Sequence, residues 1–170
     1  MRSAFLRVTL YVGLVVWACA TPVAAAPGAC DGRVYHQFDF WLGRWAVTEQ
    51  GKPAGTNQID RLLEGCALLE NWVGVGSSRG HSLNFYDATR GVWQQTWIDN
   101  SGAALNLTGH FVQDRMVLTG ESVDPKSHAK VIDRITWTPR SDGSVRQVWD
   151  RSVNQGQKWT IVFDGVYRRK

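Results

Sequence analysis

Hydrophobic and polar residues alternate along short segments from Trp45 to the end of the chain, and turn-forming residues separate these segments. Alternation of this kind places every second side chain on the same face of a β-strand. The breaks, such as "GKPAG", "DATRG" and "PRSDGS", supply the Gly, Asp and Pro residues that a chain reversal needs. The pattern predicts ten strands, over residues 45–49, 56–63, 66–74, 82–87, 92–99, 104–111, 115–122, 131–138, 145–152 and 159–168.

The links between these predicted strands are short, which favours pairing of each strand with the next one along the chain. Closing such a meander into a barrel removes the exposed edges of the sheet. No linker, repeat or long helical pattern interrupts the series. The sequence therefore predicts an all-β fold: a single domain built as an antiparallel up-and-down barrel of about ten strands.

The segment "FDFWLG", residues 38–43, is too short and too mixed for a strand. We expect a brief helical turn that plugs one end of the barrel with Phe40 and Trp41. Gly43 would permit a sharp entry into the first strand. Trp45 would then point into the floor of the barrel.

The Gly43-x-Trp45 pair is similar to the start of calycin barrels, the group of the lipocalins and fatty-acid-binding proteins. In that group a basic residue near the last strand packs over the tryptophan. The chain here ends in "VYRRK", where Arg169 shares a strand face with Tyr167, so the resemblance points to Arg169 as the partner of Trp45. Such cation–π stacking contributes on the order of 1 kcal/mol.

At wider range the chain resembles a family of uncharacterised exported bacterial proteins, over about residues 36 to 169. The matching segments are "FDFWLGRW", "GCALLENW", "SLNFYD", "RITWTP", "FDGVYRR" and the spaced set Trp93, Gln95, Trp97 and Asp99. The resemblance implies a lipocalin-like barrel. It implies no activity.

The first 25 residues read as a secretory signal peptide, with Arg2 and Arg7 before an uncharged apolar run over residues 8–20. The small residues that follow fit cleavage after Ala25. The apolar run is shorter than the roughly 20 residues that a membrane span needs. Trp17, just before Cys19, argues against a lipidated cysteine. We therefore expect an exported protein, periplasmic or secreted, whose mature domain covers residues 26–170.

Removal of this leader takes two arginines, so the formal net charge falls from +4 to +2. No basic run is longer than the terminal "YRRK", which gives little support to a nucleic-acid partner. Cys30 and Cys66 are the two cysteines that remain, and an oxidising compartment predicts a disulfide between them. A catalytic thiol is the alternative, but no Cys-x-x-Cys pair and no neighbouring base favours it.

The alternation also predicts what the barrel interior contains. Within residues 92–99, Trp93, Gln95, Trp97 and Asp99 share one face. Large rings with hydrogen-bonding groups beside them suit a cavity that orients a small, partly apolar ligand. The alternative is that tryptophan simply fills a small core. Applied to every segment, the same reasoning gives these candidate ligand-binding residues: Glu70, Trp72, Asn84, Tyr86, Gln95, Trp97, Arg134, Gln147, Trp149 and Trp159.

Arg134 is the ambiguous member of this set. In "VIDRITW" the hydrophobic alternation turns Arg134 toward solvent and Asp133 inward with Ile135. An inward Arg134 would instead pair with Glu70 or hold a ligand carboxylate. Both orientations remain open from sequence.

The sequence assigns no catalytic residue. Glu70 together with Asp99 or Asp150 is the candidate carboxylate pair for an enzyme acting on a small molecule or sugar, because glycoside hydrolysis uses two such groups. The histidines are scattered without ligand spacing, so no metal and no cofactor are predicted, although His81 or His110 leaves haem ligation open. A third alternative is an interaction protein with its rings on an exposed patch.

Overall fold

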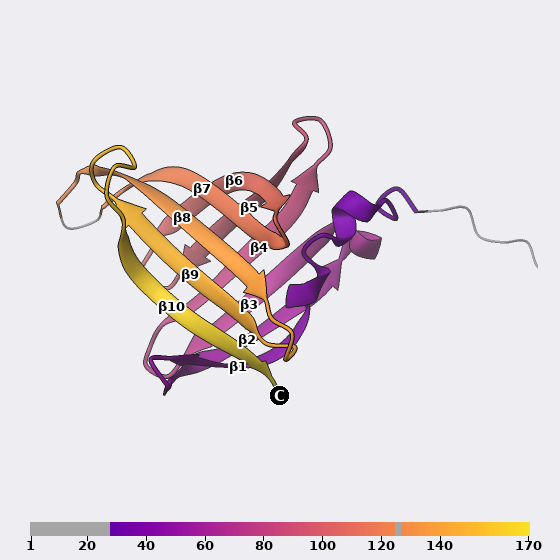
Figure 1. Cartoon of the computed structure of the whole chain (residues 1–170), viewed down its shortest axis with the longest axis horizontal. Coiled ribbons are helices and arrows are strands. Elements are labelled where there is room, and N and C mark those ends of the chain that lie inside the picture. Colours follow the sequence, from indigo (N-terminus) through magenta and orange to yellow (C-terminus); the bar gives the residue numbers. More distant parts are fainter. Residues whose placement is uncertain (1–27, 125–126) are drawn as a thin grey trace, which may run out of the picture.

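The computed structural model describes residues 28–124 and 127–170, and this part of the chain folds into one closed antiparallel β-barrel of ten strands (Figure 1). This confirms the predicted fold class. The strands are β1 (Gly43–Glu49), β2 (Lys52–Leu62), β3 (Ala67–Gly74), β4 (Arg79–Asp87), β5 (Val92–Asp99), β6 (Ala104–Val112), β7 (Arg115–Val123), β8 (Lys130–Pro139), β9 (Val145–Ser152) and β10 (Thr160–Arg169).

Each strand pairs with its neighbour in sequence, and β1 pairs with β10 to close the ring. In the closing pair Trp45 lies opposite Arg169 and Val47 lies opposite Tyr167. One boundary differs from the prediction, because "GKPAG" is mostly strand and not turn: β2 begins at Lys52. A register shift between Val47 and Thr48 accommodates Pro53, which has no N–H to donate to the ladder.

Two short 3₁₀-helices, η1 (Arg33–His36) and η2 (Asp39–Trp41), precede β1 and lie at one end of the barrel, on the right of Figure 1. We call this the plugged end. Phe38 and Trp41 are fully buried and stack with ring centroids 4.9 Å apart. Phe38 also packs edge-on against Trp93 and Trp137. The predicted helical turn is therefore present, with Phe38 and Trp41 as its main plugging residues and Phe40 only partly buried.

Gly43, Trp45 and Arg169 take the predicted structural positions. Gly43 has a φ of 119°, a backbone conformation that favours glycine. The Trp45 side chain is fully buried and donates a hydrogen bond to the Trp41 carbonyl at 2.8 Å. The Arg169 guanidinium carbon lies 4.5 Å from the centre of the Trp45 ring. These contacts connect η2, at the plugged end, to the β1–β10 strand pair that closes the barrel.

The predicted disulfide joins Cys30 to Cys66, 36 residues apart. Cys66 directly follows a third 3₁₀-helix, η3 (Leu63–Gly65), so the bond ties the N-terminal arm to the link between β2 and β3. On the chain-entropy estimate a loop of this length stabilises the fold by about 4 kcal/mol.

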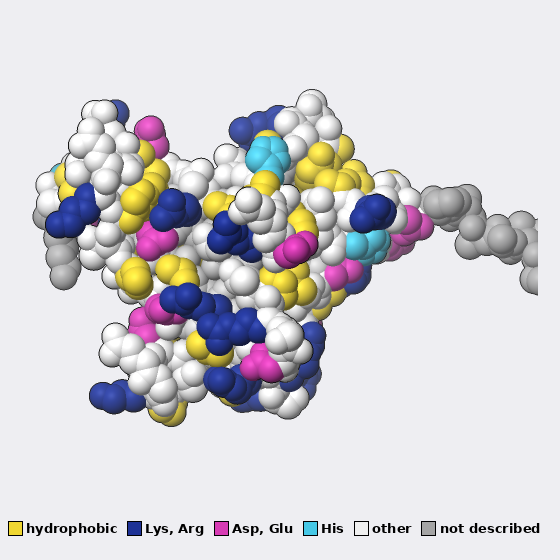
Figure 2. Space-filling view, in the orientation of Figure 1, with side chains coloured by type: hydrophobic (Ala, Val, Ile, Leu, Met, Phe, Trp, Pro, Cys, Tyr) yellow, Lys and Arg dark blue, Asp and Glu magenta, His cyan; other side chains and the backbone are white. Residues whose placement is uncertain are grey.

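We call the opposite end of the barrel the mouth. It is formed by the C-terminal ends of β1, β3, β5, β7 and β9. The β9–β10 loop lies there, at the upper left of Figure 1. Figure 2 shows basic side chains among acidic ones on the outer wall over β8, β9 and β10. The ion pair Arg134–Asp150 joins β8 to β9, and the ion pair Arg146–Asp164 joins β9 to β10. Within the described residues there is no helix whose length and apolar character would let it cross a membrane. The predicted signal peptide lies outside the described residues.

Candidate functional site

The barrel interior is not completely filled, because a cavity of about 290 Å³ remains between the plug and the mouth. Its wall combines five aromatic residues with carboxyl, amide and hydroxyl groups and three aliphatic side chains. The lining residues are Glu70, Trp72, Ser78, Gln95, Trp97, Asp99, Leu105, Ile135, Gln147, Trp149, Val162, Phe163 and Tyr167. A more open depression of about 540 Å³ at the mouth shares Trp72, Ser78 and Phe163 with it, so these residues form the boundary between the two spaces.

The aromatic rings leave this space open because glycines on the strands give them room. A Cβ atom at Gly80 of β4 would lie 2.2 Å from the ring of Trp97, and one at Gly165 of β10 would lie 2.4 Å from the ring of Phe163. Both distances are far below van der Waals contact, so any side chain there would displace the ring. Phe163 in turn meets Trp72 edge to face, with centroids 6.2 Å apart.

Glu70 is the most deeply buried acidic residue of the cavity wall, at 4% exposure. One carboxylate oxygen accepts a hydrogen bond from the amide of Asn57 at 2.7 Å, and the other accepts one from the hydroxyl of Ser82 at 2.5 Å. The network continues along the wall, because Asn84 donates to Ser82 and Gln95 donates to Asn84, each at 2.8 Å. Three strands, β2, β3 and β4, therefore hold the carboxyl group in place.

Burial raises the pKa of Glu70 from its ordinary 4.5 to about 7, although the hydrogen bonds from Ser82 and Asn57 oppose this rise. None of the ion pairs among the described residues includes Glu70. Burial and the charge of Glu70 raise the pKa of Tyr167 well above its ordinary value, so this phenol stays neutral and donates to Gln147. The cavity thus holds a carboxyl group that ionises near neutral pH.

Asp99 is the second acidic residue of the wall and lies at the mouth end of β5. Burial would raise the pKa of Asp99, but hydrogen bonds from the side chain and backbone of Ser101, with further bonds from Trp97 and Ala103, lower it. The Ser101 hydroxyl donates at 2.5 Å and the Trp97 indole N–H at 3.4 Å. Asp99 is therefore ionised at neutral pH.

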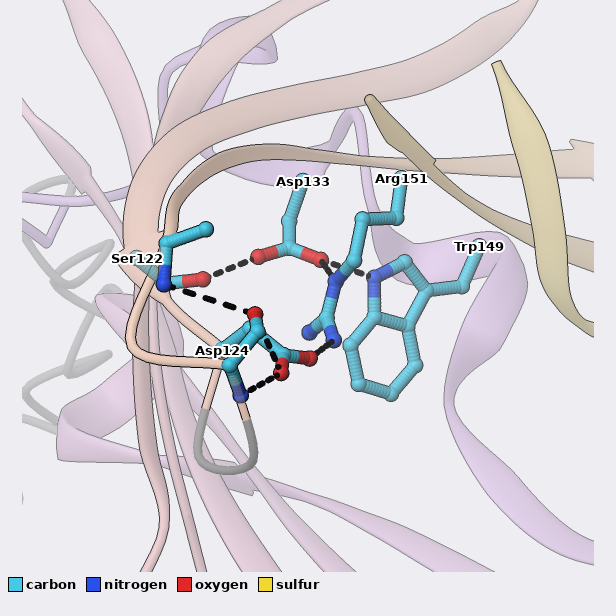
Figure 3. A network of polar contacts seen from close by, with 7 residues as sticks. Ser122, Asp124, Asp133, Trp149 and Arg151 are labelled. Carbon is cyan, nitrogen blue, oxygen red and sulfur yellow. Dashed lines mark hydrogen bonds and ion pairs between the residues drawn. The ribbon is translucent and has the colours of Figure 1, made fainter. Parts of the chain in front are cut away.

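Asp133 forms a second buried polar group, on the inner face of β8 (Figure 3). It is fully buried and accepts hydrogen bonds from the Ser122 hydroxyl, from the Trp149 indole N–H at 2.7 Å and from Arg151 Nε at 2.9 Å. The guanidinium of Arg151 also reaches Asp124 at 3.2 Å. These bonds fix the ring of Trp149 in the cavity wall and engage Arg151 with two carboxylates.

The structure brings six of the ten predicted ligand-binding residues to the cavity wall: Glu70, Trp72, Gln95, Trp97, Gln147 and Trp149. Asn84 is fully buried in the network behind Glu70 and Gln95. Tyr86 lies elsewhere, because its position near the plugged end packs it against Tyr35 and Trp93.

Arg134 and Trp159 do not belong to the cavity, which corrects the prediction for both. Arg134 lies on the outer wall, where it pairs with Asp150 at 3.1 Å and its guanidinium carbon lies 4.0 Å from the Trp159 ring centre. The hydrophobic alternation of β8 thus decides its orientation. The alternation back from Phe163 predicts an inward Trp159, but a register shift between Ile161 and Phe163 reverses the faces.

From the sequence alone, Asn57 and Ser82 have no predicted role in the site, and Asp133 is placed on the inner face without a role in the site. Each alternates correctly with an inward neighbour: Asn57 with Ile59, Ser82 with Asn84, and Asp133 with Ile135. That spacing was the available signal. Within residues 28–124 and 127–170, no three His, Cys, Asp or Glu side chains are grouped so that they could hold a metal ion.

No protein-family model matches the chain, and no curated protein matches it.

Proposed function

We propose that this is an exported protein that binds a small, partly apolar molecule inside its barrel. The observation that carries the proposal is the cavity of about 290 Å³, whose wall joins aromatic rings to oriented polar groups in an otherwise packed interior. Ligand sites of proteins are concave, largely apolar and provided with a few placed polar groups. A wall that served packing alone would need neither a fully buried carboxyl group nor its three-strand network.

Native mass spectrometry of the mature protein, purified from its own cells without detergent, tests this function. We expect a reproducible extra mass that is lost on denaturation and that quenches tryptophan fluorescence when it is added back. The Ile135→Trp variant, which fills the cavity from β8, should lose that mass. Ile132→Trp, on the outer face of the same strand, is the matched control and should retain it. A wild-type protein that carries no extra mass and whose fluorescence no cell extract alters would contradict the proposal.

Export is supported by the Cys30–Cys66 disulfide, since such bonds persist in oxidising compartments. The apolar leader predicted from the sequence supports it independently. Cell fractionation followed by mass measurement of the intact protein tests the export: we expect a periplasmic or secreted species that begins at Ala26. A cytoplasmic, uncleaved species would contradict it.

An enzyme is the second candidate function, because the cavity wall carries two carboxyl groups with opposite tendencies. The pKa of Glu70 is raised and that of Asp99 is lowered, the arrangement that lets one group act as acid while the other stays ionised. Asp150, the other predicted partner of Glu70, pairs with Arg134 on the outer wall and takes no part. Hydrolysis of aryl glycosides that is lost in both Glu70→Gln and Asp99→Asn would favour the enzyme.

A further inference from the structure

All the charged side chains that line the cavity are acidic. Glu70 and Asp99 line it, and none of its described lining residues is Lys, Arg or His. Two arginines on the adjoining strands β8 and β9 are already engaged: Arg151 contacts two carboxylates and Arg134 lies outside with Asp150. The protein therefore supplies two acidic groups to this space and no cation.

Glu70 lacks the partner that buried carboxylates normally have. Buried charges in proteins are paired or bind metal ions, because an isolated charge loses its hydration without compensation. Here the two hydrogen bonds come from neutral groups, an amide and a hydroxyl, and none of the ion pairs among the described residues includes Glu70. A positively charged ligand group would complete this site.

The rings of the wall favour the same kind of ligand. Aromatic faces attract organic cations, and Trp is the strongest of the three aromatic residues in this respect. The indole N–H groups of Trp97 and Trp149 are already donated to Asp99 and Asp133, so these residues offer the cavity their ring surface and no free donor. Phe163 and Trp72 add further ring surface beside the mouth.

Building on the proposed binding function, we propose that the ligand is a small organic cation: a protonated amine with an apolar or aromatic group, whose ammonium lies beside Glu70. The ammonium supplies the counter-ion that the barrel lacks, and the apolar part fills the space between the rings. The wall contains no positively charged group that would favour a carboxylate or phosphate ligand.

The pH dependence of binding follows from the hydrogen-bond partners of Glu70 and from the titratable groups that line the cavity with it. Asn57 of β2 and Ser82 of β4 do not titrate, Tyr167 of β10 stays neutral, and Asp99 of β5 stays ionised. Glu70 is then the group that changes charge near neutral pH. An amine that remains protonated should bind more tightly above pH 7, where Glu70 is ionised, and more weakly below it.

Three probes of similar size and different charge test the inference: 2-phenylethylamine, 2-phenylethanol and phenylacetate. Binding is measured by tryptophan fluorescence and calorimetry at about pH 8.5 and about pH 5.5, on either side of the Glu70 pKa. We expect the amine to bind about tenfold more tightly than the alcohol at the higher pH, with a smaller advantage at the lower pH, and the anion to bind most weakly. Glu70→Gln should remove the difference between amine and alcohol, whereas Glu64→Gln, the same change at an exposed position, should retain it.

Several results would overturn the inference. An alcohol that binds as tightly as the amine at both pH values rejects the ammonium site but leaves the binding function intact, as does a preference for phenylacetate. If none of the three probes binds, the proposal of a cationic ligand is also rejected. Native mass spectrometry then decides separately whether the cavity binds any molecule. If Glu70→Gln does not fold, the pH comparison on the wild-type protein decides the question.

Discussion

The buried carboxyl group of Glu70 predicts a specific pH dependence of stability, which Glu70→Gln should remove. The unfolded chain ionises this group near pH 4.5, but the folded protein holds its pKa at about 7. Between these values the folded state binds the extra proton, so stability is fully present below about pH 4.5 and falls as pH rises toward 7. Glutamine is neutral at every pH and lacks this dependence.

The size of the effect follows from the shift. A difference of about two and a half pKa units corresponds to about 3 kcal/mol, which is a large fraction of the stability of a small domain. Glutamine places an NH₂ group where Glu70 has its second oxygen, so one of the hydrogen bonds from Asn57 and Ser82 must rearrange, which costs the variant about 1 kcal/mol. The stability of the variant relative to wild type should therefore rise by about 3 kcal/mol from about pH 4 to about pH 8.

Urea unfolding of both proteins across this pH range measures the difference directly, because the titration of every other group cancels between them. Asp99→Asn is the control: the pKa of Asp99 is lowered, so its stabilisation is lost only as pH falls below the ordinary range of aspartate. If the free-energy difference between wild type and Glu70→Gln stayed constant from about pH 4 to about pH 8, the assignment of Glu70 as a buried, unpaired acid would be refuted.

Three further predictions concern the frame around the cavity. Cys66→Ser should lower the free energy of unfolding by about 4 kcal/mol, measured by urea denaturation, and a reductant should destabilise only the wild type. Arg169→Met should cost about 1 kcal/mol in the same assay through loss of the contact with Trp45, and an equal cost in a Trp45→Phe background would count against that contact. Asp133→Asn should cost about 3 kcal/mol by leaving Arg151 without its buried partner, and should alter the Trp149 fluorescence; an unchanged spectrum would contradict the fixing of this ring.

Alternation and turn chemistry were sufficient to predict the barrel, because each strand has one buried face and each link carries Gly, Asp, Asn or Pro. They do not predict the faces correctly where a bulge interrupts the two-residue alternation of a strand. The register shift before Phe163 reverses the faces, and so Trp159 lies outside although its spacing places it inside. Nothing in the local sequence marks that shift, since it depends on pairing with β9.

The site was predictable in its large residues and less so in its small ones. Glu70 and the tryptophans attract attention by their chemistry, whereas Asn57 and Ser82 acquire a role only because β2 and β4 flank β3 and aim at the same carboxylate. Asp133 sits among hydrophobic neighbours, and its role depends on Arg151, which lies on the next strand. Which side chains meet across neighbouring strands depends on the register of the strand pair. The alternation within one strand does not reveal that register.

The pairing of β1 with β10 has a consequence for how the protein acquires its structure. Every other strand pair joins neighbours in sequence, so the meander can assemble in local steps, but this pair joins the two ends of the barrel chain. Contacts between distant residues form slowly, because the entropy of the long loop is lost before the contact forms. Until then β1 and β10 are both free edges, open to pairing with another molecule. The pairing of β10 therefore determines the outcome of folding: β10 either pairs with β1 of its own chain and closes the barrel, or pairs with a strand of a second copy.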